Sequence, residues 1–113
     1  MFNVSYEGIG YLSVTIPNNT CVAGQLCKLN PVSQCEKCNV GDPFIGFAEV
    51  VNERGAAVQI AGFVKVGYSG STLPTGFIKL SSNGEGGVKL DEAGREYLVL
   101  DVDSTNFTAV IKL

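Results

Sequence analysis

The sequence predicts a compact single domain of the all-β class, and three observations carry that prediction. The chain has 113 residues, the usual length of one domain, and such a chain buries roughly two-thirds of its unfolded surface. Hydrophobic residues make up 45% and charged residues 17%, which supplies a core, while 14 Gly and 4 Pro supply many turns. Short apolar runs alternate with turn residues, and no amphipathic helix of about 12 residues is visible. We therefore expect a β-barrel or β-sandwich of about seven to nine short, mostly antiparallel strands across residues 11–113.

The first strand is expected at residues 11–16. Apolar and polar residues alternate there, with Leu12 and Val14 on the apolar face, which predicts a half-buried strand. A short apolar run follows at 25–29. Residues 30–39 show little periodicity and predict an irregular loop.

The middle of the chain predicts a long hairpin. Two apolar, β-rich runs at 44–51 and 56–66 flank a tight connection, and both are expected to lie centrally in a sheet. Gly62 interrupts the second run, where a bulge resets its phase. Residues 68–76 combine Gly, Ser, Thr and Pro, and their polarity predicts an exposed loop.

The C-terminal third predicts two further pairs of strands. Residues 77–80 and 88–90 flank an Asn-Gly pair at 83–84, which is a strong hairpin signal. Residues 97–102 and 107–113 form the last two expected strands, and apolar side chains alternate along the final one.

Charge and composition exclude several function classes. Eight Lys and Arg against eleven Asp and Glu give a net charge of −3 without any basic cluster, which disfavours nucleic-acid binding. The chain has no His, so the commonest general base and the commonest nitrogen ligand for metals are missing. No nucleophile, base and orienting group can be assembled, and we expect no enzymatic activity. No run approaches membrane-spanning length and residues 1–10 do not look like a signal peptide, so we expect a non-membrane protein made in a cytoplasm.

Four cysteines are the main candidates for chemistry: Cys21, Cys27, Cys35 and Cys38. Four thiolates can hold zinc tetrahedrally, but five residues separate the first two cysteines and only seven separate the pairs, unlike a zinc ribbon. Disulfides are a second alternative, although nothing in the sequence points to secretion. We favour reduced, metal-free thiols on and under the loop at 30–39, and we keep a zinc-stabilised β interaction module as the alternative function.

Two other segments have a weaker resemblance to known sites. Asp101 and Asp103 offer two carboxylates, but a calcium loop needs more oxygen ligands at alternating positions, so we interpret them as surface charges. The glycine-rich stretch at 82–87 lacks the Lys-Ser/Thr pair of a phosphate-binding loop, and it predicts a turn. The sequence therefore predicts no cofactor.

Several segments together resemble one protein family. They are VGDPFIGFA at 40–48, AVQIAG at 57–62 and YSG at 68–70, followed by Gly84, GVK at 87–89 and EYLV at 96–99. Over residues 3–113 the chain resembles the small structural proteins of tailed phages and prophages of Gram-positive bacteria that cement or decorate the capsid. The four cysteines are where this chain departs from the family pattern.

The resemblance implies a β-rich fold without catalysis that binds the assembled shell of a major capsid protein as a homo-oligomer, a trimer or a dimer. It also implies a place on the capsid surface of the virion, after synthesis in the bacterial host cytoplasm. Exposed aromatic and apolar side chains are then the contact candidates: Phe2, Val4 and Tyr6 in an N-terminal arm at 1–10, and Tyr68. Such an arm can add as a strand to the edge of a partner's sheet, and the alternative is an ordinary edge strand of its own sheet.

Overall fold

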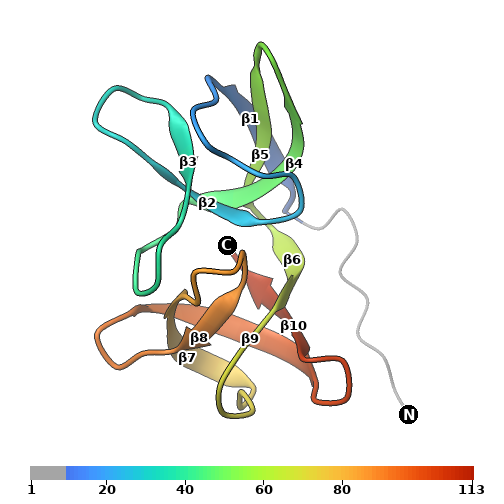
Figure 1. Cartoon of the computed structure of the whole chain (residues 1–113). Coiled ribbons are helices and arrows are strands. Elements are labelled where there is room, and N and C mark those ends of the chain that lie inside the picture. Colours follow the sequence, from blue (N-terminus) through green and yellow to red (C-terminus); the bar gives the residue numbers. More distant parts are fainter. Residues whose placement is uncertain (1–9) are drawn as a thin grey trace.

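The computed structural model describes residues 10–113 and contains two five-stranded antiparallel sheets (Figure 1). The ten strands are β1 Leu12–Ile16, β2 Leu26–Leu29, β3 Cys35–Lys37, β4 Gly46–Asn52, β5 Gly55–Ala61, β6 Phe63–Gly67, β7 Gly76–Ser82, β8 Val88–Leu90, β9 Arg95–Asp103 and β10 Thr108–Lys112. The all-β prediction is confirmed. The strand count exceeds the expected seven to nine because β3 lies within the expected loop at 30–39 and the expected run at 56–66 divides into β5 and β6. Within residues 10–113 neither sheet closes into a barrel, and no helix occurs.

The two sheets have the same strand order, so the chain contains an internal structural repeat. The first sheet runs β1-β5-β4-β2-β3 and the second runs β6-β10-β9-β7-β8, which gives every strand a counterpart five strands later. A bulge occurs at the same place in both sheets. Glu49 is the extra residue of β4 opposite β5, and Leu100 is the extra residue of β9 opposite β10. A bulge bends its strand and increases the local twist, so both sheets curve at equivalent points.

Each sheet also has a parallel bridge at an equivalent place, between a residue that follows its first strand and a residue of its last strand. Asn18, just after β1, bridges to Cys35 in β3, and Tyr68, just after β6, bridges to Val88 in β8. In each case the next amide along the chain donates to the bridged residue's carbonyl, at 2.9 Å in the first half and 3.1 Å in the second. The first and last strands of each sheet therefore approach one another at a single point.

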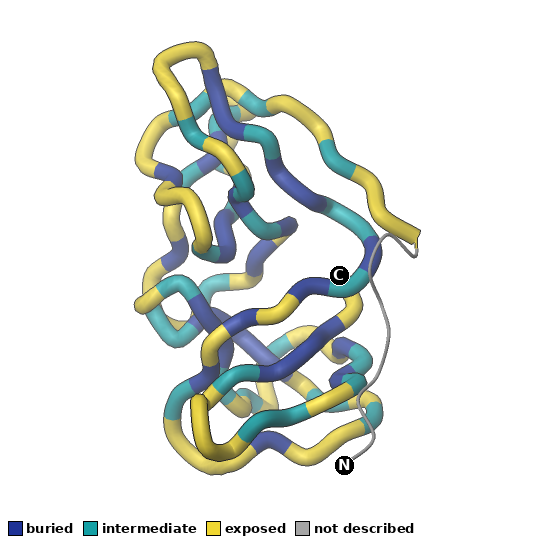
Figure 2. Tube along the Cα trace, turned by 90° about the vertical axis from the view of Figure 1, so that its right-hand side faces the viewer, coloured by how far each residue is buried: buried dark blue, intermediate teal, exposed yellow. Residues whose placement is uncertain are grey.

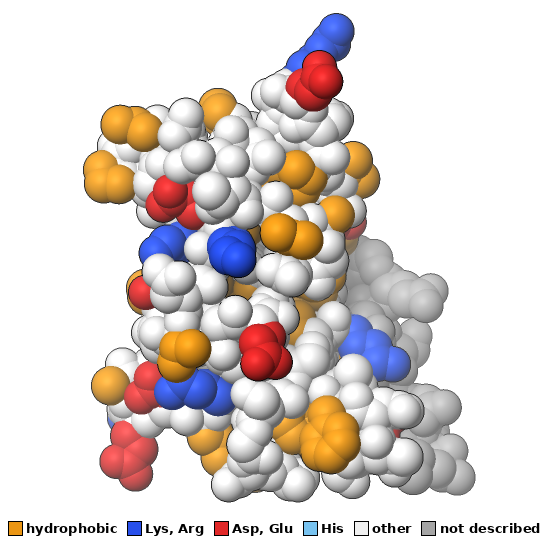
Figure 3. Space-filling view, in the orientation of Figure 1, with side chains coloured by type: hydrophobic (Ala, Val, Ile, Leu, Met, Phe, Trp, Pro, Cys, Tyr) orange, Lys and Arg blue, Asp and Glu red, His pale blue; other side chains and the backbone are white. Residues whose placement is uncertain are grey.

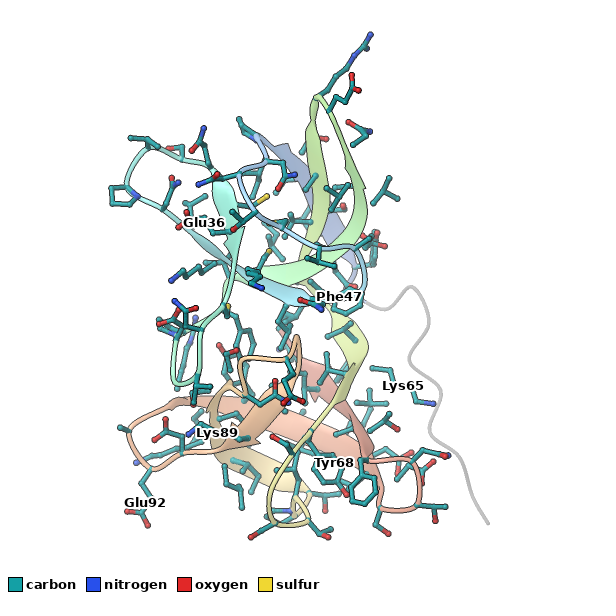
Figure 4. The ribbon with its side chains drawn as sticks, viewed as in Figure 1. Glu36, Phe47, Lys65, Tyr68, Lys89 and Glu92 are labelled. Atoms are coloured by element: carbon teal, nitrogen blue, oxygen red, sulfur yellow. The ribbon has the colours of Figure 1, made fainter. Side chains whose placement is uncertain are left out.

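The core has two parts (Figure 2). The larger part joins the two halves, because Leu26, Cys38 and Phe44 from the first half pack with the buried side chains of the second sheet. Phe44 stacks on Tyr97 with ring centroids 4.7 Å apart, and Phe47 lies at the same junction (Figure 4). The smaller part lies inside the first sheet and consists of Cys21, Cys27, Cys35, Ala48, Ala56 and Val58. Burial of these apolar side chains stabilises each part, and the larger part joins the two halves as one unit.

The central hairpin is confirmed for β4 and β5, which occupy inner positions of the first sheet. The expectation is wrong beyond Ala61, because Gly62 turns the chain at a φ of 90° into the second sheet, where β6 is an edge strand. A Cβ on Gly62 would lie 3.0 Å from the Cα of Tyr11, so this crossing leaves no room for a side chain. Nε2 of the buried Gln59 donates to the carbonyls of Ala61 and Phe63 at 3.1 and 3.0 Å, which ties the two strands together across the crossing.

Other local expectations have mixed outcomes. The β7–β8 hairpin and the β9 and β10 strands are confirmed. β1 forms as expected, and Ile16 packs against the smaller core, but the rest of its apolar face is not buried, since Leu12 is 52% and Val14 is 36% exposed at the edge of the sheet. Phe107 does not join the apolar face of the last strand, because its φ of 55° places it in the turn before β10.

Candidate functional site

Three of the four cysteine side chains meet inside the first sheet. Cys21 lies between β1 and β2, Cys27 on β2 and Cys35 on β3, and all three belong to the smaller core. Cys38 follows β3 and packs in the larger core instead. The four thiols are free, and each residue is at most 7% exposed. The expected irregular loop at 30–39 is therefore wrong in its second half, where buried thiols hold β3 against the sheet.

Burial governs the ionisation of three of these thiols, those of Cys21, Cys27 and Cys38. It raises the pKa of Cys21, helped by a hydrogen bond with the Cys35 thiol. It also raises the pKa of Cys27 to about 12 and that of Cys38 to about 11. The thiolate is the nucleophilic and metal-binding form, so these thiols are poorly suited to either role near pH 7.

The repeat gives the thiols a packing role. Cys35 and Val88 occupy equivalent bridge positions, and both are fully buried. Cys27 and Leu80 also correspond. Cys35 pairs with Leu29 and Val88 pairs with Ser82, and each of the two residues lies two positions before that partner. The first half thus places thiols where the second half places Val and Leu, which fits the behaviour of cysteine as a small hydrophobic residue. Across residues 10–113, no three or more His, Cys, Asp or Glu side chains are grouped so that they could hold a metal ion.

The predicted contact residue Tyr68 is buried, with 5% of its surface exposed. Its ring packs edge-on against Phe107, with centroids 5.9 Å apart, and it belongs to the larger core together with Leu73. The prediction that residues 68–76 form an exposed loop is therefore wrong at these two positions, because the bridge to Val88 pulls the start of the loop inward. The ring of Tyr68 is not available as a surface contact in this arrangement (Figure 4).

The other predicted contacts, Phe2, Val4 and Tyr6, lie outside the described residues, as does the arm apart from Gly10. The proposed role of this arm stays a prediction.

The acidic and glycine-rich segments form turns. Asp103 accepts hydrogen bonds from the backbone amides of Thr105 and Asn106 at 3.0 and 3.2 Å. The Asn106 side chain also donates to it, and this bond lowers the pKa of the Asp103 carboxyl. Oδ1 of Asn83 accepts from the amides of Glu85 and Gly87 in the same way. These side chains shape the β9–β10 and β7–β8 connections, as side chains of Asn and Asp commonly do in turns.

Phe77 is the most exposed aromatic side chain in the described part of the chain, at 70%. Alternation along β7 turns Leu80 inward and leaves Phe77 and Lys79 on the opposite face, where Phe77 lies across from Leu98 of β9. A hollow of about 480 Å³ adjoins it, and its lining combines apolar residues with charged residues of both signs: Pro74, Phe77, Ile78, Lys79, Leu90, Asp91, Glu92 and Glu96. Sequence reasoning placed Phe77 on a strand but did not single it out. Its shared face with Lys79 was the signal that could have found it.

The remaining surface is of mixed charge. On the face shown in Figure 3, acidic and basic side chains are interspersed, and hydrophobic side chains are scattered between them. The tip of the β4–β5 hairpin, where Glu53 and Arg54 lie, carries one charge of each sign. Single exposed apolar residues are normal on a soluble surface, so exposure by itself does not mark a site.

Comparisons with known proteins identify no relative. No family model matches the chain, and no curated protein and no solved structure matches it either. Residues 10–113 include no helix with the length and apolar character needed to span a membrane.

Proposed function

We propose that the protein is a non-enzymatic virion protein of a tailed phage, which decorates or cements the capsid by binding the assembled shell of the major capsid protein. The family resemblance over residues 3–113 supports this proposal. Its longest segments, 40–48 and 57–62, fall on the approach to β4 and on β5, the centre of the first sheet. Homo-oligomerisation, the virion location and synthesis in a bacterial cytoplasm belong to the same proposal.

The observation that best fits shell binding is the exposed ring of Phe77 beside its hollow. Phe77 lies on a strand that is paired on both sides, so its backbone is already fixed before a partner covers the ring. A decoration subunit also repeats each contact many times over the shell. Weak contacts then add into tight retention, and one exposed ring per subunit suffices to contribute.

Co-sedimentation with intact shells tests this proposal. We expect Phe77→Ala to lower the apparent affinity for shells at least tenfold, a loss of about 1.4 kcal/mol in the apparent binding free energy. Phe107→Ala is the matched control, because it removes a ring that is 57% exposed in a turn. Both variants should keep the β-rich circular dichroism spectrum. If full-length protein fails to co-sediment with shells of its own phage, the proposed function is wrong.

Deletion of residues 1–10 tests the arm in the same assay. A strand-adding arm provides backbone hydrogen bonds together with the apolar anchors Phe2 and Val4. Its removal should leave the circular dichroism spectrum intact and reduce co-sedimentation. Undiminished co-sedimentation would exclude the arm and leave the rest of the proposal standing.

A further inference from the structure

The two sheets together have four edge strands, and three of them carry charges. β3 contains Glu36 and Lys37, β6 contains Lys65 and β8 contains Lys89 (Figure 4). A charged side chain, lysine above all, is a common device by which proteins keep an open strand edge from pairing with another chain. These three edges are therefore protected against strand addition.

β1 is the exception among the described edges. Its sequence, Leu-Ser-Val-Thr-Ile, has no charge and no proline, and among the described residues it pairs with β5 alone. Leu12 is 52% and Val14 is 36% exposed, although both are apolar. The register shift between β1 and β5 leaves Ile60 of β5 as the extra residue, so β1 itself is a regular strand. Among the described residues no strand pairs with its outer side, and contact with β3 begins only after β1, at Pro17 and Asn18.

The repeat supplies an internal comparison. β1 and β6 occupy the same place in their sheets, and Thr15 corresponds to Lys65 because they face the equivalent residues Ala57 and Val110. The edge strand β6 of the second sheet thus carries a lysine, Lys65, at the position where the equivalent edge strand β1 has Thr15. Fold geometry does not account for that difference, whereas coverage of β1 by another strand does.

The strand sequence also specifies which strand fits. Read backward, Leu-Ser-Val-Thr-Ile keeps its pattern of apolar and hydroxyl side chains. In antiparallel pairing about a two-fold axis at Val14, that residue faces the partner's Val14, Leu12 faces the partner's Ile16 and Ser13 faces the partner's Thr15. Every pair is apolar with apolar or hydroxyl with hydroxyl, and no like charges meet.

We propose that β1 is a self-association edge, at which a second copy of this chain adds its own β1 antiparallel and two-fold symmetric. The first sheets of the two copies then form one continuous ten-stranded sheet, and Leu12 and Val14 become covered. This proposal does not rest on shell binding. Its tests use the purified chain without shells, so either proposal can fail alone.

Sedimentation equilibrium of the purified chain, over a dilution series that reaches about 1 mM, provides the first test. We expect the molar mass to rise toward twice 11.9 kDa with concentration. Val14→Lys places two ammonium groups opposite one another at the axis and should weaken the dimer at least tenfold. Val50→Lys is the matched control, because Val50 is exposed in the same sheet on the inner strand β4, and it should leave the dimer unchanged. A monomeric full chain at every concentration, or equal loss in both variants, would overturn the proposal.

Crosslinking provides a second test that does not depend on tolerance of a lysine. Cβ atoms of directly opposite residues lie about 4.5–5.5 Å apart, so Val14→Cys should form an intermolecular disulfide with oxidised glutathione. Val50→Cys should not, and the native thiols are buried, which keeps the background low. Equal crosslinking of the two variants would refute the two-fold pairing. A chain that is monomeric in full length but dimeric after deletion of residues 1–10 would assign the edge to that segment and also overturn the proposal.

Discussion

Gly46→Ala tests how β4 fits between its two neighbours. Gly46 begins β4 and pairs with Cys27 of β2. A Cβ on Gly46 would lie 2.2 Å from the carbonyl oxygen of Gln59 and 2.8 Å from Cγ1 of Val58. Carbon–oxygen contacts between strands are normally about 3.3 Å or longer, so β5 would have to move by roughly 1 Å.

The cost follows from that displacement. Overpacking of a rigid core costs about 1–3 kcal/mol, and a contact with backbone places this substitution toward the upper end. Replacing Gly by Ala returns about 0.4–1 kcal/mol by restricting the unfolded chain. We expect a net destabilisation of about 2 kcal/mol, which lowers Tm by roughly 8 °C in a domain of this size.

Thermal unfolding followed by far-ultraviolet circular dichroism measures the effect. Gly67→Ala is the matched control, since Gly67 also lies in a strand but a Cβ there would meet nothing closer than 3.8 Å. That variant should be as stable as the natural chain or slightly more so. If Gly46→Ala proves at least as stable as Gly67→Ala, the packing of β4 against β5 is not as described.

Three further predictions concern the core. Val58 is fully buried, so Val58→Asp should abolish folding, because an unpaired buried carboxylate costs several kcal/mol. Lys112→Asp, at an exposed position, should change stability by about 0.5 kcal/mol. Equal Tm shifts of the two variants would contradict the assigned faces. Burial raises the pKa of Cys27 to about 12 from its ordinary 9.0, so the folded state holds a proton that the unfolded state loses. Stability should therefore be intact below pH 9 and fall as the pH rises toward 12, measured by urea unfolding. Thiol-specific reagents should react slowly at pH 8 with folded protein and fast after unfolding, and fast reaction with folded protein would count against buried thiols.

Local patterns were sufficient for most strands. The β4–β5 and β7–β8 hairpins were predicted because apolar runs flank short turn signals, and neighbouring strands pair across such turns without long-range information. β3 was missed because its three residues, Cys-Glu-Lys, are too few to show alternation. It pairs with its neighbour β2, and Cys35 also contacts Pro17 and Asn18, which lie far back along the chain.

The candidate sites show the same division. The cysteines were identified from sequence, and their burial was not, because it depends on three segments that converge inside one curled sheet. Tyr68 was placed on the surface by its polar neighbours, whereas its bridge to Val88 draws it into the core. Phe77 was not singled out, although it shares a face of its strand with Lys79, because alternation shows which residues share a face and packing decides which face is buried.

The sequence by itself determined the all-β class, most strand positions and the absence of histidine chemistry, because alternation, turn residues and composition act over a few neighbours. Tertiary structure decided the division into two equivalent five-stranded sheets. The sequences of the two halves did not indicate this repeat. It also decided that β1 lies at the edge of the first sheet within residues 10–113, while Gly62 sends β6 into the other sheet. Such outcomes depend on which strands pair over long distances. That pairing is a property of the packed whole, since an edge exists only where no further strand is added.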